Sequence, residues 1–271
     1  VLIADQVAAI ANQIFLLPDN RVTSTAAWIG VVAFAVQIYF DFSGYTDMAI
    51  GLARMFGFGF PENFDRPYSS QSITDFWRRW HMSLSSWFRD YVYIPLGGNR
   101  KGRLRTYVNL GTVFTLTGVW HGANWTFLVW GCFHGACLII ERATGLGVTH
   151  ARRFVAFRRL LTFALVCIGW ALFRARDLSQ AWNFIHAMIC PRGIDVPVAT
   201  TEVITGQRLF YFAIGLLVVA FPPRLRFGQA LSLEAGRRRE MLRIAVLATV
   251  APLACLYALS SSFSPFLYFK F

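Results

Sequence analysis

Charge is scarce in this sequence, and negative charge is scarcer still. Charged residues make up 15% of the 271 positions, compared with about 25% in soluble domains. Asp and Glu number 14 against 26 Lys and Arg, and Lys101 and Lys270 are the two lysines. Hydrophobic residues make up 56%, and the mean hydropathy is +0.47. This composition excludes a disordered chain and argues against an ordinary soluble enzyme.

Paired cysteines, a first methionine and a signal peptide are also lacking. The five cysteines form no CxxC pair, so the sequence predicts no disulfide framework and no metal site, and we expect the cysteines to serve packing. The chain begins at Val1 without the charged segment and cleavage site of a signal peptide. We therefore expect residues 1–271 to be a single membrane domain, the C-terminal part of a longer chain.

Long apolar stretches separate the arginines, and this arrangement decides what the net charge of +12 means. A basic excess is typical of nucleic-acid binding or of loops that flank membrane spans, and arginines between apolar stretches indicate loops. The lipid bilayer is therefore the expected partner, and nucleic acid is not. The apolar stretches cover residues 26–40, 107–120, 124–140, 160–173, 181–189, 209–221 and 241–259. Several are shorter than the roughly 20 residues of a spanning helix. We predict an all-α polytopic membrane protein with spanning, re-entrant and amphipathic helices.

Arginine clusters predict which way the chain crosses the membrane. The clusters lie at residues 100–105, 152–159 and 224–239, and the positive-inside rule places all three on the cytoplasmic side. The hairpin between the first two clusters then returns to its starting side. Residues 176–207 and the C-terminus are predicted to lie on the outer side.

An amphipathic helix is predicted over residues 75–93, after a capping-box pattern at Ser72–Asp75 and before Pro95. At 100° per residue, one arc collects its large apolar side chains, namely Phe76, Trp77, Trp80, Leu84, Trp87, Phe88 and Tyr91. His81 is predicted at the rim of this arc, beside Trp77 and Phe88. Two interpretations of His81 remain open: an interfacial residue whose polar tip reaches water, or a titratable group where an aqueous funnel meets an apolar tunnel.

A second histidine, His121, lies between two apolar stretches, at the predicted tip of a hairpin. An ionisable residue at membrane depth is a functional candidate. Trp120 and Trp125 are expected to wall its surroundings, and Asn124 to orient the imidazole by a hydrogen bond. The alternative is a structural histidine that is hydrogen-bonded to a backbone carbonyl.

Three further features are weaker candidates. Residues 41–47 hold Asp41, Tyr45 and Asp47 beside an apolar stretch, which favours a structural polar network over a proton relay or substrate site. His134 is expected to be a polar contact in the core, and His150 and His186 lie in no recognisable constellation. The segment 97–102 lacks the ending of a phosphate-binding loop.

Three stretches make the sequence similar to a known family. They read QIYFDFSGYTDMAIGLARMFGF at 37–58, FPENFDRPYSSQSITDFWRRWHMSLSSWFRDYVYIPLGGNRKG at 60–102 and LTGVWHGANWTFLVWGCFHG at 116–135, and the ending SPFLYFKF fits as well. The chain resembles the membrane-bound O-acyltransferase superfamily, in its bacterial, alginate O-acetyltransferase-like branch. The resemblance covers nearly the whole chain, and full-length members are considerably longer.

The resemblance implies a ring-like membrane domain around a central tunnel, here incomplete, in a multi-pass protein of the bacterial inner membrane. It implies that the WHG histidine, His121, is the principal catalytic residue and that the RWH histidine, His81, is a second functional one. It also implies transfer of an acetyl group from a cytoplasmic donor, acetyl-CoA or an equivalent, to an extracytoplasmic polysaccharide. Separate periplasmic acetyltransferase proteins are the implied partners, and no cofactor is expected to be tightly bound.

We therefore predict an O-acyltransferase in which His121 acts as general base or carries the acyl group, and His81 assists proton transfer. Arg78 and Arg79 are expected to steer anionic groups. The other supporting residues of the predicted tunnel are Trp77, Trp120, Asn124, Asp41 and Tyr45. A proton-coupled transporter or channel that uses the same histidines is the alternative, and a scaffold of a polysaccharide-export complex is a third possibility. The acceptor polymer is not readable from these residues.

Overall fold

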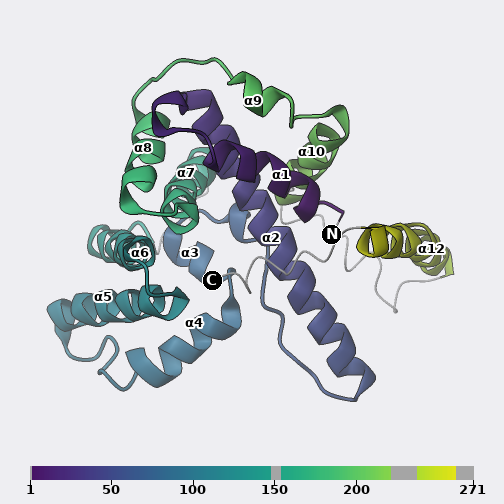
Figure 1. Cartoon of the computed structure of the whole chain (residues 1–271). Helices are drawn as coiled ribbons and strands as arrows, with labels where there is room; N and C mark the ends of the chain where they lie inside the picture. The colour runs from purple at the N-terminus through teal and green to yellow at the C-terminus, as the bar shows by residue number, and fades with distance from the viewer. Residues whose placement is uncertain (1, 148–153, 221–236, 261–271) are drawn as a thin grey trace.

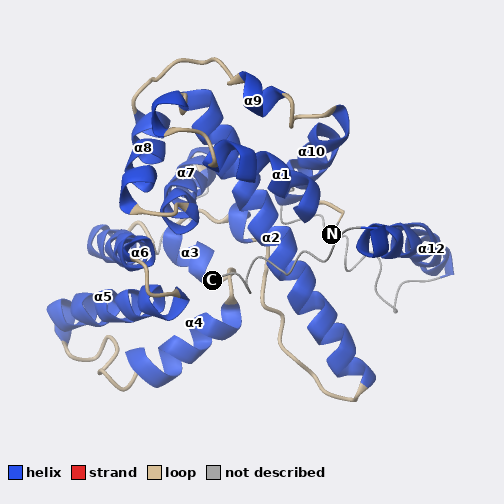
Figure 2. Ribbon diagram, viewed as in Figure 1, coloured by secondary structure: helices blue, strands red, loops and turns tan. Residues whose placement is uncertain are grey.

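The computed structural model describes residues 2–147, 154–220 and 237–260, and the regular secondary structure of these residues is helical (Figures 1 and 2). The helices are α1 (Ala4–Phe15), α2 (Ser24–Met55), α3 (Ile73–Trp77), α4 (Met82–Phe88), α5 (Gly102–His121), α6 (Trp125–Thr144), α7 (Val155–Arg174), α8 (Leu178–Ile189), α9 (Val198–Thr201), α10 (Gly206–Ala220) and α12 (Arg237–Ser260). The predicted all-α class is confirmed.

Two of these helices, α2 and α7, are long and apolar enough to cross a membrane. The 32-residue α2 begins after Thr23, whose side chain accepts a hydrogen bond from the Ala26 N–H. It continues through the polar residues 41–47 without a break. Helix α1 packs against it where Gly30 leaves room, because a Cβ at that position would lie 2.5 Å from Ile14 Cγ2.

Helices α5 and α6 form the predicted hairpin, with its tip at residues 121–124. Glycines bring the two backbones together, since a Cβ at Gly118 would clash with the Phe127 carbonyl oxygen, and one at Gly131 with that of Phe114. Small residues that allow close backbone approach are typical of helix contacts in membranes. The hairpin therefore places the end of α5 at a fixed position relative to α6.

The predicted continuous helix over residues 75–93 is wrong. Its start is correct, because the Ser72 hydroxyl accepts a hydrogen bond from the Asp75 N–H at 3.0 Å. The helix then breaks at His81, resumes as α4 and ends in a π-helical turn, Arg89–Tyr93. The 100° spacing does not carry across the break. Phe88 is buried, but Trp87 and Tyr91, predicted on the same face as Trp77, are 51% and 68% exposed.

An aromatic core joins α2, α3, α6 and α7. Its fully buried members include Phe34, Phe76, Trp130 and Trp170. The Trp170 indole donates to the Tyr68 hydroxyl at 3.0 Å, and this hydroxyl donates to the Ala35 carbonyl at 2.8 Å. The core therefore contains a chain of two hydrogen bonds in addition to its apolar packing, and the buried Trp170 and Tyr68 polar groups both have partners.

Helix α3 is held at its N-terminus by a carboxylate from α6. Glu141 accepts hydrogen bonds from the Ile73 N–H at 2.6 Å, and from the N–H and hydroxyl of Thr74 at 2.9 and 2.7 Å. A negative charge at this end complements the helix dipole. Glu141 thus fixes α3 to the far end of the α5–α6 hairpin.

Several predictions concern residues outside the described ones: Arg152, Arg153, Arg224, Arg226, His150 and the ending SPFLYFKF. The five cysteines are all free. Cys167 is buried as expected, whereas Cys132, Cys190 and Cys255 are exposed, so the packing interpretation is wrong for these three. In the parts of the chain that the structure describes, no group of three metal-ligating side chains is found.

Candidate functional site

His121 is the last residue of α5, and its ring is held by its own helix. Nδ1 lies 2.8 Å from the Thr117 carbonyl oxygen. A carbonyl can only accept, so Nδ1 carries the proton of this hydrogen bond, and in the neutral ring the lone pair lies on Nε2. The ring packs among Trp130 at 4.9 Å and Phe173 at 5.3 Å between centroids. The alternative of a structural histidine bonded to a carbonyl therefore holds for Nδ1. Nε2 carries the lone pair and has the properties of a base.

His81 forms the corner between α3 and α4, and it has a left-handed backbone with φ 45° and ψ 56°. Few residues other than glycine adopt this conformation. Asn63, which is 7% exposed, stabilises the corner: its carbonyl accepts from the Met82 N–H at 3.0 Å, and its Oδ1 from the Ser83 N–H at 3.1 Å. The same Oδ1 lies 3.4 Å from His81 Nδ1. The break in the predicted helix therefore has a tertiary cause, the contact with Asn63.

The structure brings the two histidines to one place. The Trp120 ring contacts both, with centroids 6.4 Å from His81 and 4.9 Å from His121. Phe42 of α2 lies against His81 at 4.7 Å. The predicted contacts of His81 with Trp77 and Phe88 are replaced by these, because the corner turns the ring away from the α3 face. Burial lowers the pKa of His81 to about 3, and charge on His121 acts in the same direction.

His134 is a polar contact in the core, as predicted. It is 1% exposed, and the Trp77 indole N–H donates to its Nδ1 at 3.4 Å. Gly169 of α7 makes room for the ring, since a Cβ there would lie 2.5 Å from His134 Nε2. Trp77 therefore belongs to the packing behind the site. It reaches His121 through Trp130, whose centroid is 5.7 Å from that of Trp77.

Two predicted neighbours of His121 have other roles. The Asn124 Oδ1 accepts from the Thr126 N–H at 3.1 Å, which caps α6, and its Nδ2 donates to the Arg176 carbonyl at 3.1 Å. Asn124 therefore fixes the hairpin tip to the segment after α7. The imidazole of His121 is oriented by the Thr117 carbonyl and not by Asn124. Both tryptophans are exposed, Trp120 at 53% and Trp125 at 69%, but Trp120 walls the site because its ring lies against His81 and His121.

The charged candidates lie around the site rather than in it. Arg79 forms ion pairs with Asp75 at 2.8 Å and Asp65 at 3.9 Å, so its charge is already used within the fold. Arg78 is exposed. On α2, Asp41 is half-buried and precedes Phe42, which contacts His81, while Tyr45 is 39% exposed.

Four residues of the site were not anticipated: Asn63, Thr117, Phe42 and Phe173. Each acts through a contact between segments far apart in the chain, or through a backbone atom, and a single sequence carries no signal for either. The site lies apart from the pocket of about 580 Å³ that Asp19, Asn20, Val22, Thr23, Asn183 and Arg192 line.

Comparison with known proteins identifies the family of this chain. The sequence profile of the membrane-bound O-acyltransferase family matches residues 18–176, which include His81, Asn63 and His121. The chain belongs to this family. Within the matched region, the corner at His81 and the hairpin tip at His121 lie against the same Trp120 indole.

Three relatives show the range of this family. A Pseudomonas putida protein named "Probable alginate O-acetylase AlgI" is 42% identical over 290 residues, covering 100% of this chain and 58% of the relative. A Helicobacter pylori peptidoglycan O-acetyltransferase is 33% identical, covering 100% of this chain and 54% of the relative. A Bacillus subtilis teichoic acid D-alanyltransferase is 33% identical over 54% of this chain and 40% of the relative. The chain thus spans little more than half the length of the alginate and peptidoglycan relatives.

Proposed function

We propose that this chain is the catalytic C-terminal part of an O-acyltransferase, a multi-pass protein of the bacterial inner membrane. It passes an acetyl group from a cytoplasmic donor, acetyl-CoA or an equivalent, toward an extracytoplasmic polysaccharide, with periplasmic acetyltransferase proteins as partners. The observation that carries this proposal is the His81–Trp120–His121 arrangement, in which a hydrogen-bonded Nδ1 leaves the lone pair of His121 on Nε2. The names of the relatives supply the acyl chemistry and the polymeric acceptors.

In the proposed reaction, His121 Nε2 accepts the proton of an acceptor hydroxyl while the hydroxyl oxygen attacks the acyl carbonyl carbon. The bond between this carbon and the donor's leaving atom breaks, and the proton passes from Nε2 to that atom. The Thr117 carbonyl stabilises the imidazolium that forms in between, because it accepts the Nδ1 proton. His81, neutral at ordinary pH, takes part in positioning and proton transfer from the other side of Trp120.

The aromatic walls serve this chemistry by excluding water. Trp120, Trp130 and Phe173 cover the His121 ring, and Phe42 covers His81. An activated acyl group in such surroundings meets the acceptor hydroxyl rather than bulk water. The central tunnel through which donor and acceptor reach the histidines is part of the proposal.

The test is His121→Ala in the full-length protein, with His186→Ala on α8 as the matched control. Polymer acetylation is measured at equal abundance in the membrane. Loss of a general base lowers the rate about 10²- to 10⁴-fold, whereas the control retains activity. Undiminished acetylation in His121→Ala contradicts the role of His121. Solute flux by the purified protein without acyl transfer supports the transporter alternative.

A further inference from the structure

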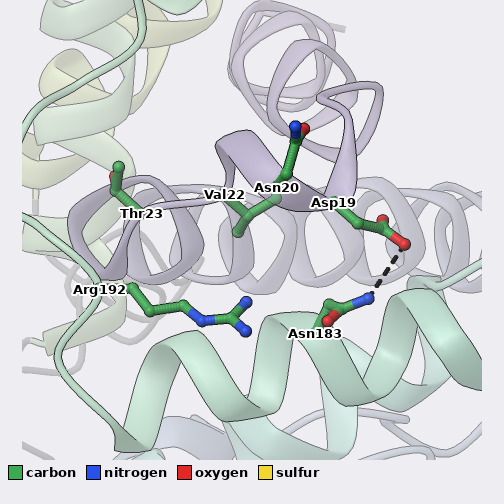
Figure 3. A pocket seen from close by; sticks show the side chains of 6 residues that line it. All are labelled: Asp19, Asn20, Val22, Thr23, Asn183 and Arg192. Atoms are coloured by element: carbon green, nitrogen blue, oxygen red, sulfur yellow. Dashed lines mark hydrogen bonds between the residues drawn. The ribbon is translucent and has the colours of Figure 1, made fainter.

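A polar pocket of about 580 Å³ lies at the end of the molecule formed by the α1–α2 turn and the C-terminal end of α8. Its lining comes from four segments: the 3₁₀ turn Asp19–Arg21, the start of α2, helix α8 and the loop after it. Figure 3 shows the Arg192 side chain extending between the turn and α8, toward Asn183. The volume lies within the ~300–1,000 Å³ of small-molecule sites.

The walls of this pocket are held in place by hydrogen bonds between distant segments. The Thr23 hydroxyl donates to the Asp195 carbonyl at 2.7 Å, and the Ser24 N–H to the Gly193 carbonyl at 3.2 Å. The Arg192 N–H donates to the Ser24 hydroxyl at 2.8 Å. The backbone of the loop after α8 is therefore fixed to the start of α2, so the Arg192 side chain projects from a preorganised position.

Two groups of opposite charge in this pocket have bonding capacity that the fold does not use. Asp19 Oδ2 accepts from the Asn183 amide at 3.0 Å, but its Oδ1 is buried without a donor among the described residues. Arg192 is exposed, and among the described residues its guanidinium forms no ion pair. A ligand that fits offers a hydroxyl to the carboxylate and an anionic oxygen to the guanidinium.

We infer that this pocket binds a carboxylated sugar unit of the acceptor polysaccharide. A sugar acid carries hydroxyl donors and a carboxylate on one rigid ring, which matches Asp19, Asn183 and Arg192. The inference rests on the proposed function and on the positive-inside prediction that residues 176–207, and with them Asn183 and Arg192, lie on the outer side, where the polymer is. Uronic acids and muramic acid share this chemistry.

The position of the pocket relative to the histidines suits a polymer. The Arg176 carbonyl just before α8 accepts from Asn124 at the hairpin tip, next to His121. The 12 residues of α8 then lead to the pocket, roughly 18 Å at 1.5 Å per residue. A polysaccharide that binds through one sugar at Arg192 can therefore extend its further sugar units along α8 toward the acyl-transfer site.

The experiment measures equilibrium binding of three tetrasaccharides to the full-length protein in detergent: a uronic acid oligomer, a muramic acid oligomer and a neutral glucose oligomer. We expect a carboxylated oligomer to bind and the neutral one to bind more weakly. Arg192→Gln weakens binding about tenfold or more, and Arg192→Lys by less, because it keeps the charge but loses the bidentate geometry. Which carboxylated oligomer binds identifies the source of the sugar.

The matched control is Arg21→Gln, an exposed arginine of the neighbouring 3₁₀ turn that does not line the pocket, and it leaves binding unchanged. Equal binding of the neutral oligomer, or unchanged binding in Arg192→Gln with an unchanged unfolding midpoint, overturns the inference. His121→Ala separates the two proposals, because it abolishes transfer and retains binding. Arg192-dependent binding without any acetyl transfer by the wild type contradicts the proposed function alone.

Discussion

The left-handed backbone of His81 and the hydrogen-bonded Nδ1 of His121 are the two residue-level features that shape the site. At His81, the Asn63 side chain stabilises a conformation that most residues avoid. At His121, the Thr117 carbonyl selects the tautomer. In both rings Nδ1 lies close to a protein oxygen, which orients the ring and defines the chemical role of Nε2.

The backbone and the imidazole of His81 can be tested separately. Asn enters the left-handed region readily, whereas Ala there costs about 1–2 kcal/mol. We expect His81→Asn to unfold at nearly the wild-type midpoint and His81→Ala at a lower one, with acetyl transfer impaired in both. The measurements are thermal unfolding in detergent and polymer acetylation in membranes. Full activity of His81→Asn would show that the imidazole is not needed.

At the scale of elements, the close contact between α5 and α6 sets the position of His121. The contact depends on Gly118 and Gly131, where the opposing backbone leaves no room for a Cβ. The α6 helix is also tied to α3 through Glu141 and through the Trp77–His134 hydrogen bond. The hairpin therefore sets the position of His121, and its contacts with α3 connect it to the segment that leads to His81.

Alanine substitutions in α5 test the contact between α5 and α6. At Gly118, the added Cβ meets the Phe127 carbonyl and forces the helices apart, which we expect to destabilise the protein by about 1–3 kcal/mol and to reduce acetylation. Gly111 in the same helix is the matched control, because nothing lies within 4 Å of a Cβ built there. Gly111→Ala is expected to be neutral or slightly stabilising. Equal behaviour of the two variants in unfolding and acetylation assays would argue against a tight hairpin.

At the scale of the whole molecule, the start of the α5–α6 hairpin and its tip, which lies beside the end of α7, mark two separate ends of the hairpin. The α5–α6 hairpin starts within the arginine-rich segment 100–105 and turns at Asn124, which donates to the Arg176 carbonyl just after α7. Arg176, at the start of the segment 176–207, therefore lies beside the hairpin tip, and residues 100–105 lie at the other end of α5. The positive-inside rule predicts that the two segments lie on opposite sides of the membrane, and this remains a prediction.

Cysteine labelling in intact cells tests the sidedness of these two ends. In a variant with the other four cysteines replaced by serine, the exposed Cys190 is expected to react with a membrane-impermeant maleimide from the periplasm. A cysteine at position 101, introduced as Lys101→Cys with Cys190→Ser, is expected to react only after the inner membrane is permeabilised. The reverse pattern would invert the topology and remove Arg192 from the side of the polymer.

The sequence by itself determined the helical class, the hairpin with His121 at its tip, the cap at Ser72 and the membership that the RWH and WHG motifs signal. These features depend on neighbours within one or two helical turns or on the identity of a few residues. Only the tertiary structure decided the break at His81, the role of Asn124 and the meeting of two histidines at Trp120. Each of these depends on a contact between segments far apart in the chain, such as Asn63 with Ser83, and helical periodicity contains no information about such contacts.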